Sequence, residues 1–404
     1  MTFLVLVESN TTGTGRLFCA RARELGLRPV VFARDPGRYP YVEADAIENR
    51  RVDTTSTAAV LDACGSLPGP VAGVTSSSEY FIATASEAAR ALGLAHPDPD
   101  AVRICRDKHA QRRRLRDGGV PSPRFGAAGT PDEASELAGR IGFPVVVKPV
   151  AGSGSIAVRL CHTPGEVRAA AAAVLDVDPA TLALPPQTCV VVEEYLTGPE
   201  FSVETFDDVV VCVTRKHLGP EPYFVETGHD IPAPLPASEH AALHAGAVAA
   251  LRALGLGWGA AHVELRNTPA GPRVVEVNPR LAGGMIPRAV QEASGIDLIH
   301  HMVAKAAGRS EPLRLTRAIG ASIRFVIART AGRLVSVDGV DKARAMPGVV
   351  EVGVTGQPGQ EVTLRHSFQD RLGYVIATDE NSIVAAHLAQ TALDVLSVKI
   401  EALP

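Results

Sequence analysis

The segment Arg273–Gly284, RVVEVNPRLAGG, is the part of the sequence that most strongly indicates the fold and the kind of site. Side chains alternate between the two faces of a strand, so Glu276, Asn278 and Arg280 are expected on one face and the intervening valines on the other. The β-branched run predicts an interior strand. A buried carboxylate needs a partner, a proton or a metal ion, and oxygen ligands at this spacing suit Mg²⁺ with phosphate oxygens in its remaining positions. A surface strand with a charge-paired face is the alternative, and this segment alone does not separate the two.

The preceding strand favours the metal interpretation. AAHVELRN, residues 260–267, is followed by a turn around NTPAGP and then by the segment above. If the two strands form a hairpin, Glu264 and Glu276 can face each other across the ladder. Like charges directly opposite are destabilising, and a divalent cation between them removes that penalty. The pair therefore predicts half of a metal site for the phosphates of ATP.

A glycine-rich stretch, AGSGSIAV at residues 151–158, joins two predicted strands of a hairpin, with Lys148 just before it. A Gly/Ser loop offers backbone N–H groups and hydroxyls to phosphate oxygens, and the lysine can neutralise phosphate charge. The stretch is not a Walker A loop, because the GKS/T sequence and a following helix are both absent. A plain mobile hairpin is the alternative.

The run VVVEEYLTGPEFSVETF, residues 190–206, predicts a buried strand, a turn and a second strand. An adenine ring can lie against such a connector, read by backbone groups, while a carboxylate holds the ribose diol. Glu200, at the start of the second strand, suits the diol. Glu194 fits a solvated position equally well.

An earlier glycine turn, TGTGRLF, follows the first predicted strand and invites comparison with a dinucleotide fingerprint. The pattern reads Gly13-x-Gly15-x-x-Phe18, and the third position must be small for close helix–strand packing. Asp35, the acidic residue that could bind a ribose, lies in a turn-like context. The match is weak, so nicotinamide binding is disfavoured.

Composition limits the class of protein. The chain has 404 residues, 46% apolar and 21% charged, with a net charge of −4, which suits a multidomain globular protein and gives no electrostatic support to nucleic-acid binding. The basic cluster Arg112, Arg113 and Arg114 is expected on a solvated helix face. No apolar stretch reaches the roughly 18 residues that span a bilayer. We expect a cytoplasmic protein that binds neither nucleic acid nor membranes.

Six scattered cysteines without a CxxC pair argue against a zinc ribbon or a disulfide framework, and most are expected to be reduced core residues. Strand and helix signals alternate over residues 1–100, which predicts a parallel α/β domain. Later strands are joined by short turns and predict antiparallel sheets with helices on one side.

In this order, the motifs KP…GSGS…VVEEYLTGPEFSVE…HVEL…VVEVNPRLAGG resemble the ATP-grasp superfamily of carboxylate–amine ligases over residues 100–310. The chain most resembles the L-amino-acid ligases that make dipeptides, because FVETGHDIPAPLP, residues 224–236, looks like their substrate-facing segment. The resemblance implies an α/β and α+β protein with four parts. These are an N-terminal pre-ATP-grasp domain (1–100), a small lobe with a linker helix and the glycine loop (101–190), a large lobe with the adenine hinge and Mg²⁺ site (191–310) and a C-terminal α+β domain (311–404).

The resemblance also implies roles for individual residues. Those expected to contact ATP are Lys108, Lys148, Ser153, Gly154, Ser155, Glu193, Glu194, Tyr195, Leu196 and Glu200. The expected ligands of Mg²⁺, or of Mn²⁺ as the alternative ion, are Glu264, Glu276 and Asn278. Those expected to face the substrates are Glu226, Thr227, His229, Arg280, Gly283, Gly284 and Met285.

The implied reaction has two steps: a carboxylate takes the γ-phosphate of ATP, and an amine then displaces phosphate from the acyl phosphate to form an amide. Lys148 and Arg280 are the expected catalytic residues, and Arg280 suits phosphate because its fork can bind bidentately. The sequence does not identify a residue that would act as the general base for the amine. His229 is one option, although an exposed or merely binding role fits it equally.

The chain departs from the pattern of some L-amino-acid ligases at Arg215, Lys216 and His217. This trio could hold a substrate carboxylate or a phosphate, or could be a solvated strand end. The alternatives to a peptide-forming ligase are a purine- or biotin-pathway enzyme that activates formate or bicarbonate, and a non-catalytic nucleotide-binding module. The expected partners are small-molecule acids and amines, and a homodimer is the expected assembly.

Overall fold

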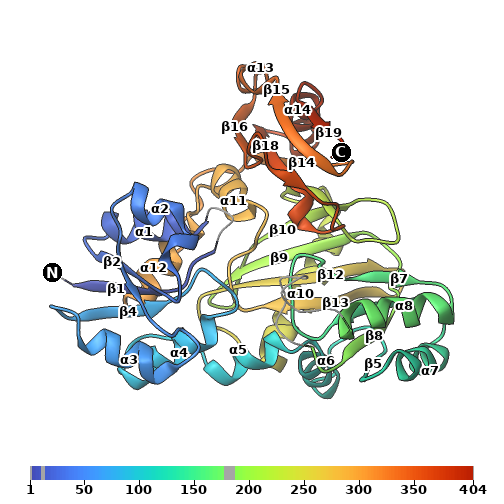
Figure 1. Cartoon of the computed structure of the whole chain (residues 1–404), viewed down its shortest axis with the longest axis horizontal. Coiled ribbons are helices and arrows are strands. Elements are labelled where there is room, and N and C mark those ends of the chain that lie inside the picture. Colours follow the sequence, from blue (N-terminus) through green and yellow to red (C-terminus); the bar gives the residue numbers. More distant parts are fainter. Residues whose placement is uncertain (1, 11–13, 177–186, 404) are drawn as a thin grey trace.

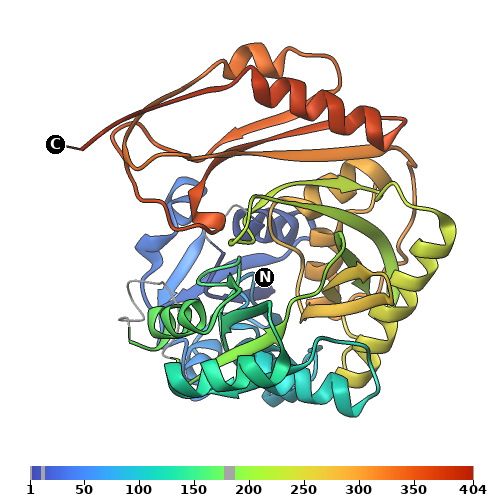
Figure 2. The same cartoon turned by 90° about the vertical axis from the view of Figure 1, so that its right-hand side faces the viewer.

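The computed structural model describes residues 2–10, 14–176 and 187–403. Gly13 of the incomplete fingerprint lies outside these ranges. The molecule has an N-terminal part and a small sheet at opposite ends, a large sheet between them, and a C-terminal layer above (Figures 1 and 2). The division of the chain at residues 100, 190 and 310 stays a prediction, so the sheets are described here one by one.

The N-terminal part is a parallel α/β unit, as predicted. Its four-stranded sheet has the order β3-β2-β1-β4, and all its strand pairs are parallel. The strands are β1 (Phe3–Val7), β2 (Arg28–Ala33), β3 (Glu48–Arg51) and β4 (Val71–Thr75). The helices are α1 (Thr14–Glu24), η1 (Pro36–Arg38), α2 (Pro40–Ala44), α3 (Thr57–Gly65) and α4 (Ile82–Ala91).

A helix from much later in the chain completes this unit. In α12 (Leu298–Ala306), the side chains of Ile299, Val303 and Ala306 pack into the same buried cluster as Leu4 of β1. Figure 1 shows α12 beside α1. The N-terminal unit is therefore anchored to the segment that follows the large sheet's hairpin.

The small sheet carries the glycine loop. Its order is β5-β8-β6-β7, and β6 and β7 form the antiparallel hairpin that the sequence predicts. The strands are β5 (Phe125–Ala128), β6 (Val145–Pro149), β7 (Arg159–Cys161) and β8 (Val190–Glu194). The helices α5 (Pro99–Arg106) and α6 (Lys108–Asp117) precede this sheet, and α7 (Pro131–Ile141) and α8 (Pro164–Leu175) pack on it.

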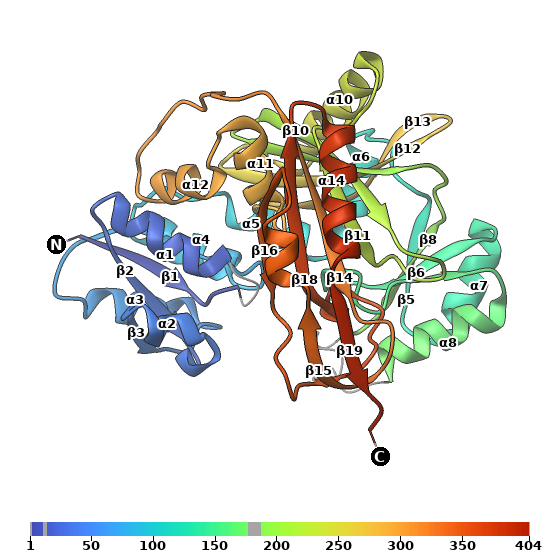
Figure 3. The ribbon, with the colours of Figure 1, turned by 90° about the horizontal axis from the view of Figure 1, so that it is seen from above.

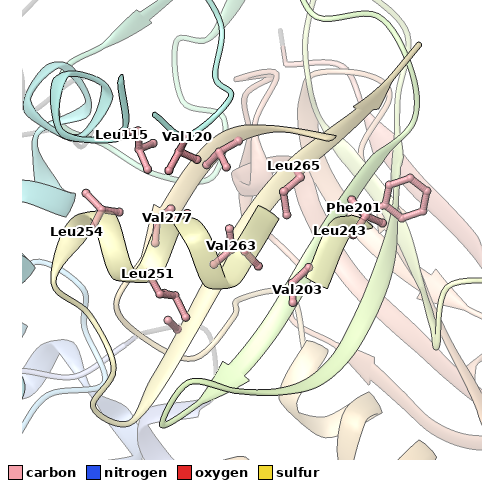
Figure 4. Close-up of a cluster of buried hydrophobic side chains, with 14 of the residues drawn as sticks. Leu115, Val120, Phe201, Val203, Leu243, Leu251, Leu254, Val263, Leu265 and Val277 are labelled. Atoms are coloured by element: carbon pink, nitrogen blue, oxygen red, sulfur yellow. The ribbon is translucent and has the colours of Figure 1, made fainter. Parts of the chain in front are cut away.

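The large sheet has eight antiparallel strands in the order β13-β12-β9-β10-β11-β14-β18-β16. They are β9 (Glu200–Phe206), β10 (Val209–Leu218), β11 (Glu226–Ile231), β12 (Ala260–Thr268), β13 (Gly271–Asn278), β14 (Gly320–Ile327), β16 (Val349–Val354) and β18 (Arg371–Asp379). The helix α10 (Ala237–Leu254) places Leu243, Leu251 and Leu254 against β9, β12 and β13 (Figure 4). The sheet thus runs from the predicted metal strands into the C-terminal part without a break.

The remaining elements belong to the C-terminal layer and its connection. The layer's smaller sheet has the order β17-β15-β19, with β15 (Gly332–Asp338), β17 (Glu361–Val362) and β19 (Ser397–Glu401). Its helices are α13 (Val340–Arg344), η2 (Phe368–Asp370) and α14 (Ser382–Asp394), and α11 (Ile286–Ser294) leads into α12. Seen from above, this layer lies between the N-terminal part and the small sheet (Figure 3).

The prediction that residues 273–278 form an interior strand is wrong, because β13 is the edge of the eight-stranded sheet. Its outer edge is covered by side chains of α6 and by the loop after it. Gln111 Nε2 donates to the oxygen of Val277 (2.7 Å) and Gln111 Oε1 accepts from its nitrogen (2.9 Å), and Arg112 donates to the oxygen of Val275. The strand has an interior composition because its edge is capped rather than solvated.

The prediction that Val275 and Val277 lie on the same face of the strand is also wrong. The ladder shifts register between Glu264 and Leu265, so that Val275 is skipped and Val274 joins Val277 in the core. Such a bulge re-aims side chains, and here Val275 lines the cleft beside Glu276. In the described residues no helix is long and apolar enough to cross a membrane.

Candidate active site

A cleft between the small sheet and the large sheet brings together most of the predicted ATP residues. It has an empty volume of about 880 Å³ and is open to solvent. The predicted residues that line it are Lys108, Lys148, Ser153, Gly154, Ser155, Glu193, Glu194, Tyr195, Leu196, Glu200, Glu226, Glu264 and Glu276. The cleft wall also includes Lys216 and Arg266, which were not predicted as site residues.

Lys148 lies at the end of β6 with its ammonium group inside the protein. Its Nζ lies 2.6 Å from Oε2 of Glu193, whose Oε1 accepts from Nε of Arg112 at 2.6 Å. Burial lowers the pKa of Lys148 to about 8, although Glu193 opposes the shift. A bound phosphate would favour the charged form of this lysine.

The predicted solvated face of α6 is wrong for Arg112, whose side chain is only 1% exposed. Arg113 and Arg114 are exposed, as predicted. Burial works against ionisation of Glu193, but Arg112 and Lys148 together hold its pKa below the usual range. The carboxylate of Glu193 therefore orients Lys148, and any hinge contact with adenine falls to the backbone of this connector.

Lys108 is the first residue of α6 and reaches back to the glycine loop. Its Nζ donates to the oxygen of Gly152 at 2.6 Å and lies 2.9 Å from Oε1 of Glu276. The predicted phosphate lysine thus joins the loop to the predicted metal strand.

Glu264 and Glu276 are direct partners across the β12–β13 ladder, as the hairpin prediction required. Two positions further along the ladder, Asn278 pairs with His262. His262 contacts Glu204 through Nδ1 (2.9 Å) and Glu264 through Nε2 (3.0 Å). Burial opposes protonation of His262, but the two carboxylates raise its pKa to about 9, so it carries a positive charge at pH 7.

These residues fit a hard cation only in combination with a ligand. Among the described residues no three His, Cys, Asp or Glu side chains already form a metal-binding group. Glu264 and Glu276 supply two carboxylates on opposed strands, and phosphate oxygens and water can supply the other positions that Mg²⁺ requires. Asn278 is buried and does not line the cleft.

Lys216 is the centre of the largest ion cluster. Its Nζ lies 3.0 Å from Glu200, 2.8 Å from Glu226 and 2.8 Å from Glu264. Burial works against its charge, but the three carboxylates raise its pKa well above the usual value. The solvated interpretation of the 215–217 trio is therefore wrong for Lys216.

The predicted adenine end of the cleft is aromatic and cationic. The guanidinium of Arg266 lies 5.3 Å from the ring centre of Tyr195 and 5.5 Å from that of Phe224. Its Nε donates to Glu200 at 3.2 Å, and Nη1 donates to the oxygen of Leu196 at 2.9 Å. Glu194 pairs with Arg124 at the rim, which matches the solvated alternative for that residue.

The glycine loop is held by the C-terminal layer. A methyl group built on Gly154, where φ is +63°, would lie 2.2 Å from Cδ1 of Phe368. The N–H of Phe368 donates to the oxygen of Gly154 at 3.3 Å, and Ser155 Oγ donates to the oxygen of Phe224 at 2.8 Å. The loop therefore contacts both the substrate-facing segment and the C-terminal layer.

Arg280 lies outside the cleft lining and is paired with Glu79 of the N-terminal part. Its Nε donates to Glu79 Oε2 at 2.6 Å, and Arg106 lies 3.4 Å from the other oxygen. Burial opposes ionisation of Glu79, but the two arginines lower its pKa to about 2. To meet an acyl phosphate, Arg280 would have to exchange this carboxylate for the phosphate.

Of the other residues predicted to face the substrates, one lines the cleft and the rest lie outside its lining. Glu226 lines the cleft, whereas Thr227 Oγ1 donates to the oxygen of His217 at 3.2 Å. His229 is fully buried, so the exposed alternative for it is wrong. Gly283, Gly284 and Met285 form the turn between β13 and α11.

Several ion-paired residues in and around the site were not among the predicted site residues, namely Lys216, Arg112, Arg266, His262, Glu79 and Arg371. Each has at least one partner far away in the chain, as with Arg371 and Glu226, which are 145 positions apart, although His262 also contacts Glu264 nearby. Lys216 alone left a signal, because it alternates with the buried Thr214 and so belongs to the inward face of β10.

Two sheets that enclose a cleft of buried lysines, paired carboxylates and a glycine loop define an ATP-grasp enzyme, and this chain belongs to that class. Residues 141–288 match the model of the ATP-grasp domain. Within the class the chain belongs to the L-amino acid ligase family, since residues 324–401 match the model of the L-amino acid ligase C-terminal domain 2.

Three known proteins are similar to this chain. An uncharacterized protein, y4rH, from Sinorhizobium fredii is 38% identical over 97% of this chain and 81% of its own length. Carnosine synthase 1 from Gallus gallus is 31% identical over 71% of this chain, which spans only 33% of that longer protein. The crystal structure of an L-amino acid ligase from Bacillus licheniformis has the same fold, with a TM-score of 0.82 over 99% of both chains at 23% identity.

Proposed function

We propose that this protein joins two amino acids into a dipeptide at the expense of ATP, through an acyl phosphate, with ADP and phosphate as co-products. The observation that carries the proposal is the arrangement around the β12–β13 ladder. Glu264 and Glu276 oppose each other there, Lys108 approaches from α6, and Lys148 approaches from the small sheet. This set neutralises phosphate and holds it in line, which is the main task in phosphoryl transfer.

The steps can be assigned to residues. Lys108 and Lys148 hold the phosphates under the glycine loop, and the first substrate's carboxylate oxygen attacks the γ-phosphorus while ADP leaves. Arg280 turns from Glu79 to the new acyl phosphate, because a guanidinium fork suits its oxygens. The amine nitrogen of the second substrate then attacks the acyl carbon, phosphate leaves, and the amine loses a proton to solvent.

Mg²⁺, held by Glu264 and Glu276, would offset the charge that develops on the transferred phosphoryl group. Asn278 is proposed as a further ligand, and Mn²⁺ as the alternative ion. In its present position Asn278 is buried beside His262, so this role requires the end of β13 to shift.

The test is turnover across all pairs of the common amino acids with ATP and Mg²⁺, following ADP release and product mass. We expect release that depends on a particular pair, with a product mass equal to the two acids less water. ADP release at full rate without an amine, and without any product, would reject a ligase. Turnover that depends on bicarbonate would favour the carboxylating alternative instead.

The proposal includes a cytoplasmic homodimer, because two-fold dimers are the commonest assembly among soluble oligomers. Light scattering of the purified protein tests the stoichiometry, and fluorescence of a tagged chain in its own cells tests the location. A monomer at micromolar concentration would reject the dimer without affecting the proposed reaction.

A further inference from the structure

A group of polar side chains lies outside the lining of the cleft, where β11, β14, β18 and the Gly283–Met285 turn meet, and is called the polar corner below. A methyl group built on Gly284 would lie 3.0 Å from Nε2 of His229, 3.2 Å from Cζ of Phe325 and 3.4 Å from Nη1 of Arg371. Around Gly283 nothing lies within 4 Å of the same construction. Two polar side chains and an aromatic ring thus pack closely against Gly284, and the open space lies beside Gly283.

His229 contributes an unused hydrogen-bonding group to this corner. It is fully buried, and neither ring nitrogen has a hydrogen-bond partner among the residues that the structure describes. Its Nε2 lies 3.7 Å from Oε2 of Glu226, and its ring meets that of Phe325 edge-on. Burial lowers the pKa of His229 to about 3. The neutral imidazole therefore has one donor and one acceptor, and buried groups of this kind normally have partners.

Arg371 contributes unused donors from the C-terminal layer. Its Nη2 donates to Oε2 of Glu226 at 2.7 Å, and its Cζ lies 3.7 Å from the ring centre of Phe325. Its Nε is buried without a hydrogen-bond partner in the described part of the chain. Glu226 accepts from Nη2 through Oε2 and through its backbone oxygen at 3.3 Å, which leaves Nε for another acceptor.

This corner is connected to the predicted metal site by a row of ion pairs. Arg371 contacts Glu226 (2.7 Å), Glu226 contacts Lys216 (2.8 Å), and Lys216 contacts Glu264 (2.8 Å). Arg371 is thus three ion pairs away from Glu264, one of the carboxylates proposed to flank the phosphates.

We infer that Arg371, assisted by His229, binds the carboxylate of the amine substrate. The inference rests on the proposed function. When two amino acids are joined, the carboxylate of the first must face the lysines and the phosphate, whereas that of the second does not react. An arginine away from the lysines, with a free side of its fork, suits that unreactive carboxylate. The assignment places acceptor recognition on β18, outside the ATP-grasp match at residues 141–288.

The test compares acceptors with and without a carboxylate. Hydroxylamine displaces phosphate from an acyl phosphate and gives a hydroxamate, but it has no carboxylate to anchor. For Arg371→Gln we expect the KM for the amino acid acceptor to rise about 10- to 100-fold, as for the loss of a charge-assisted hydrogen bond. Hydroxamate formation from the same acid should fall by no more than about threefold.

A second comparison uses the common amino acids and their α-amides as acceptors. The wild-type protein should prefer the acid, and Arg371→Gln should remove most of this preference. Arg371→Lys keeps the charge but cannot bind Glu226 and a ligand with one planar fork, so it should show a smaller loss of the same kind. Arg333→Gln, at an exposed position on β15, is the matched control and should change neither reaction.

The outcomes separate the inference from the function on which it rests. Equal loss of hydroxamate and dipeptide in Arg371→Gln, with or without a lower melting temperature, would overturn the inference, as would no loss of either. Hydroxamate from the wild-type protein with no amino acid acceptor accepted would also overturn it. Absence of both products from every common acid would reject the proposed function itself.

Discussion

Glu264 and Glu276 pair directly across the β12–β13 ladder, yet each carboxylate is neutralised by a lysine from a different element. Lys216 of β10 contacts Glu264, and Lys108 of α6 contacts Glu276. The structure thus removes the repulsion between the carboxylates without a metal ion. A cation that enters between them must compete with Lys108, which also holds the glycine loop through Gly152.

Replacing Glu276 should therefore lower the rate of turnover much more than it lowers the stability of the fold. For Glu276→Gln we expect ADP release to fall about 100-fold or more, since a metal contributes several kcal/mol to charge neutralisation in the transition state. The Mg²⁺ concentration at half-maximal rate should also rise. ADP release measured against Mg²⁺ concentration checks both. The exposed Glu361→Gln is the control, and wild-type rates in Glu276→Gln would contradict the assignment.

The state of Lys148 should be visible in a pH profile. Because burial lowers its pKa to about 8, the lysine is charged below that pH and loses its proton above it. We expect kcat/KM for ATP to be level below about pH 8 and to fall above it. Steady-state kinetics between pH 6 and 9.5 measure this.

Lys148→Arg provides the control for this profile, because a guanidinium stays charged throughout the range. The fall near pH 8 should disappear in this variant, even if its overall rate is lower. His262, whose pKa is raised to about 9, should still titrate at higher pH. An unchanged fall near pH 8 would assign that limb to another group.

Removal of Lys216 should destabilise the fold. Lys216→Met leaves three carboxylates around an apolar side chain, and loss of one partner from a buried ion cluster costs about 3–5 kcal/mol. Chemical denaturation should show this loss, and the double variant with Glu226→Gln should recover part of it because one charge fewer remains unpaired. Lys342→Met, at an exposed position of α13, is the matched control.

The contact between Gly154 and Phe368 predicts a double-mutant result. Gly154→Ala introduces a methyl group 2.2 Å from the ring at a φ of +63°, so the KM for ATP should rise as the glycine loop is displaced. Phe368→Ala should relieve the clash but not the backbone strain, so the double variant should recover only in part. Gly165→Ala has open space around it and is the control. Additive effects of the two changes would mean that the residues do not interact.

Local sequence patterns were sufficient to predict the strands and hairpins, but not which distant segments would lie beside them. The hairpins of β6–β7 and β12–β13 follow from alternation and turn residues, and the opposition of Glu264 and Glu276 follows from their register. The edge position of β13 could not be predicted, because Gln111 and Arg112 supply the missing strand's hydrogen bonds from a helix.

The sequence also failed to predict which charged residues are buried. A run of arginines or the RKH trio looks solvated because charge is costly to bury unless a partner is present. The partner of Arg112 lies on the small sheet, and the partners of Lys216 and Arg371 lie on other strands of the large sheet, so the segment that carries each residue does not reveal its partner. The roles assigned to the site residues stay predictions until the experiments above are made.

The continuous ladder from β11 to β14 and β18 has a consequence for protein engineering. Transplanting the C-terminal layer from a relative would replace the strands that flank His229 and carry Phe325 and Arg371. A chimaera joined between β13 and β14 should therefore inherit its acceptor preference from the graft while keeping the host's nucleotide chemistry. It would do so only if the grafted residue at position 368 also accommodates the host's glycine loop.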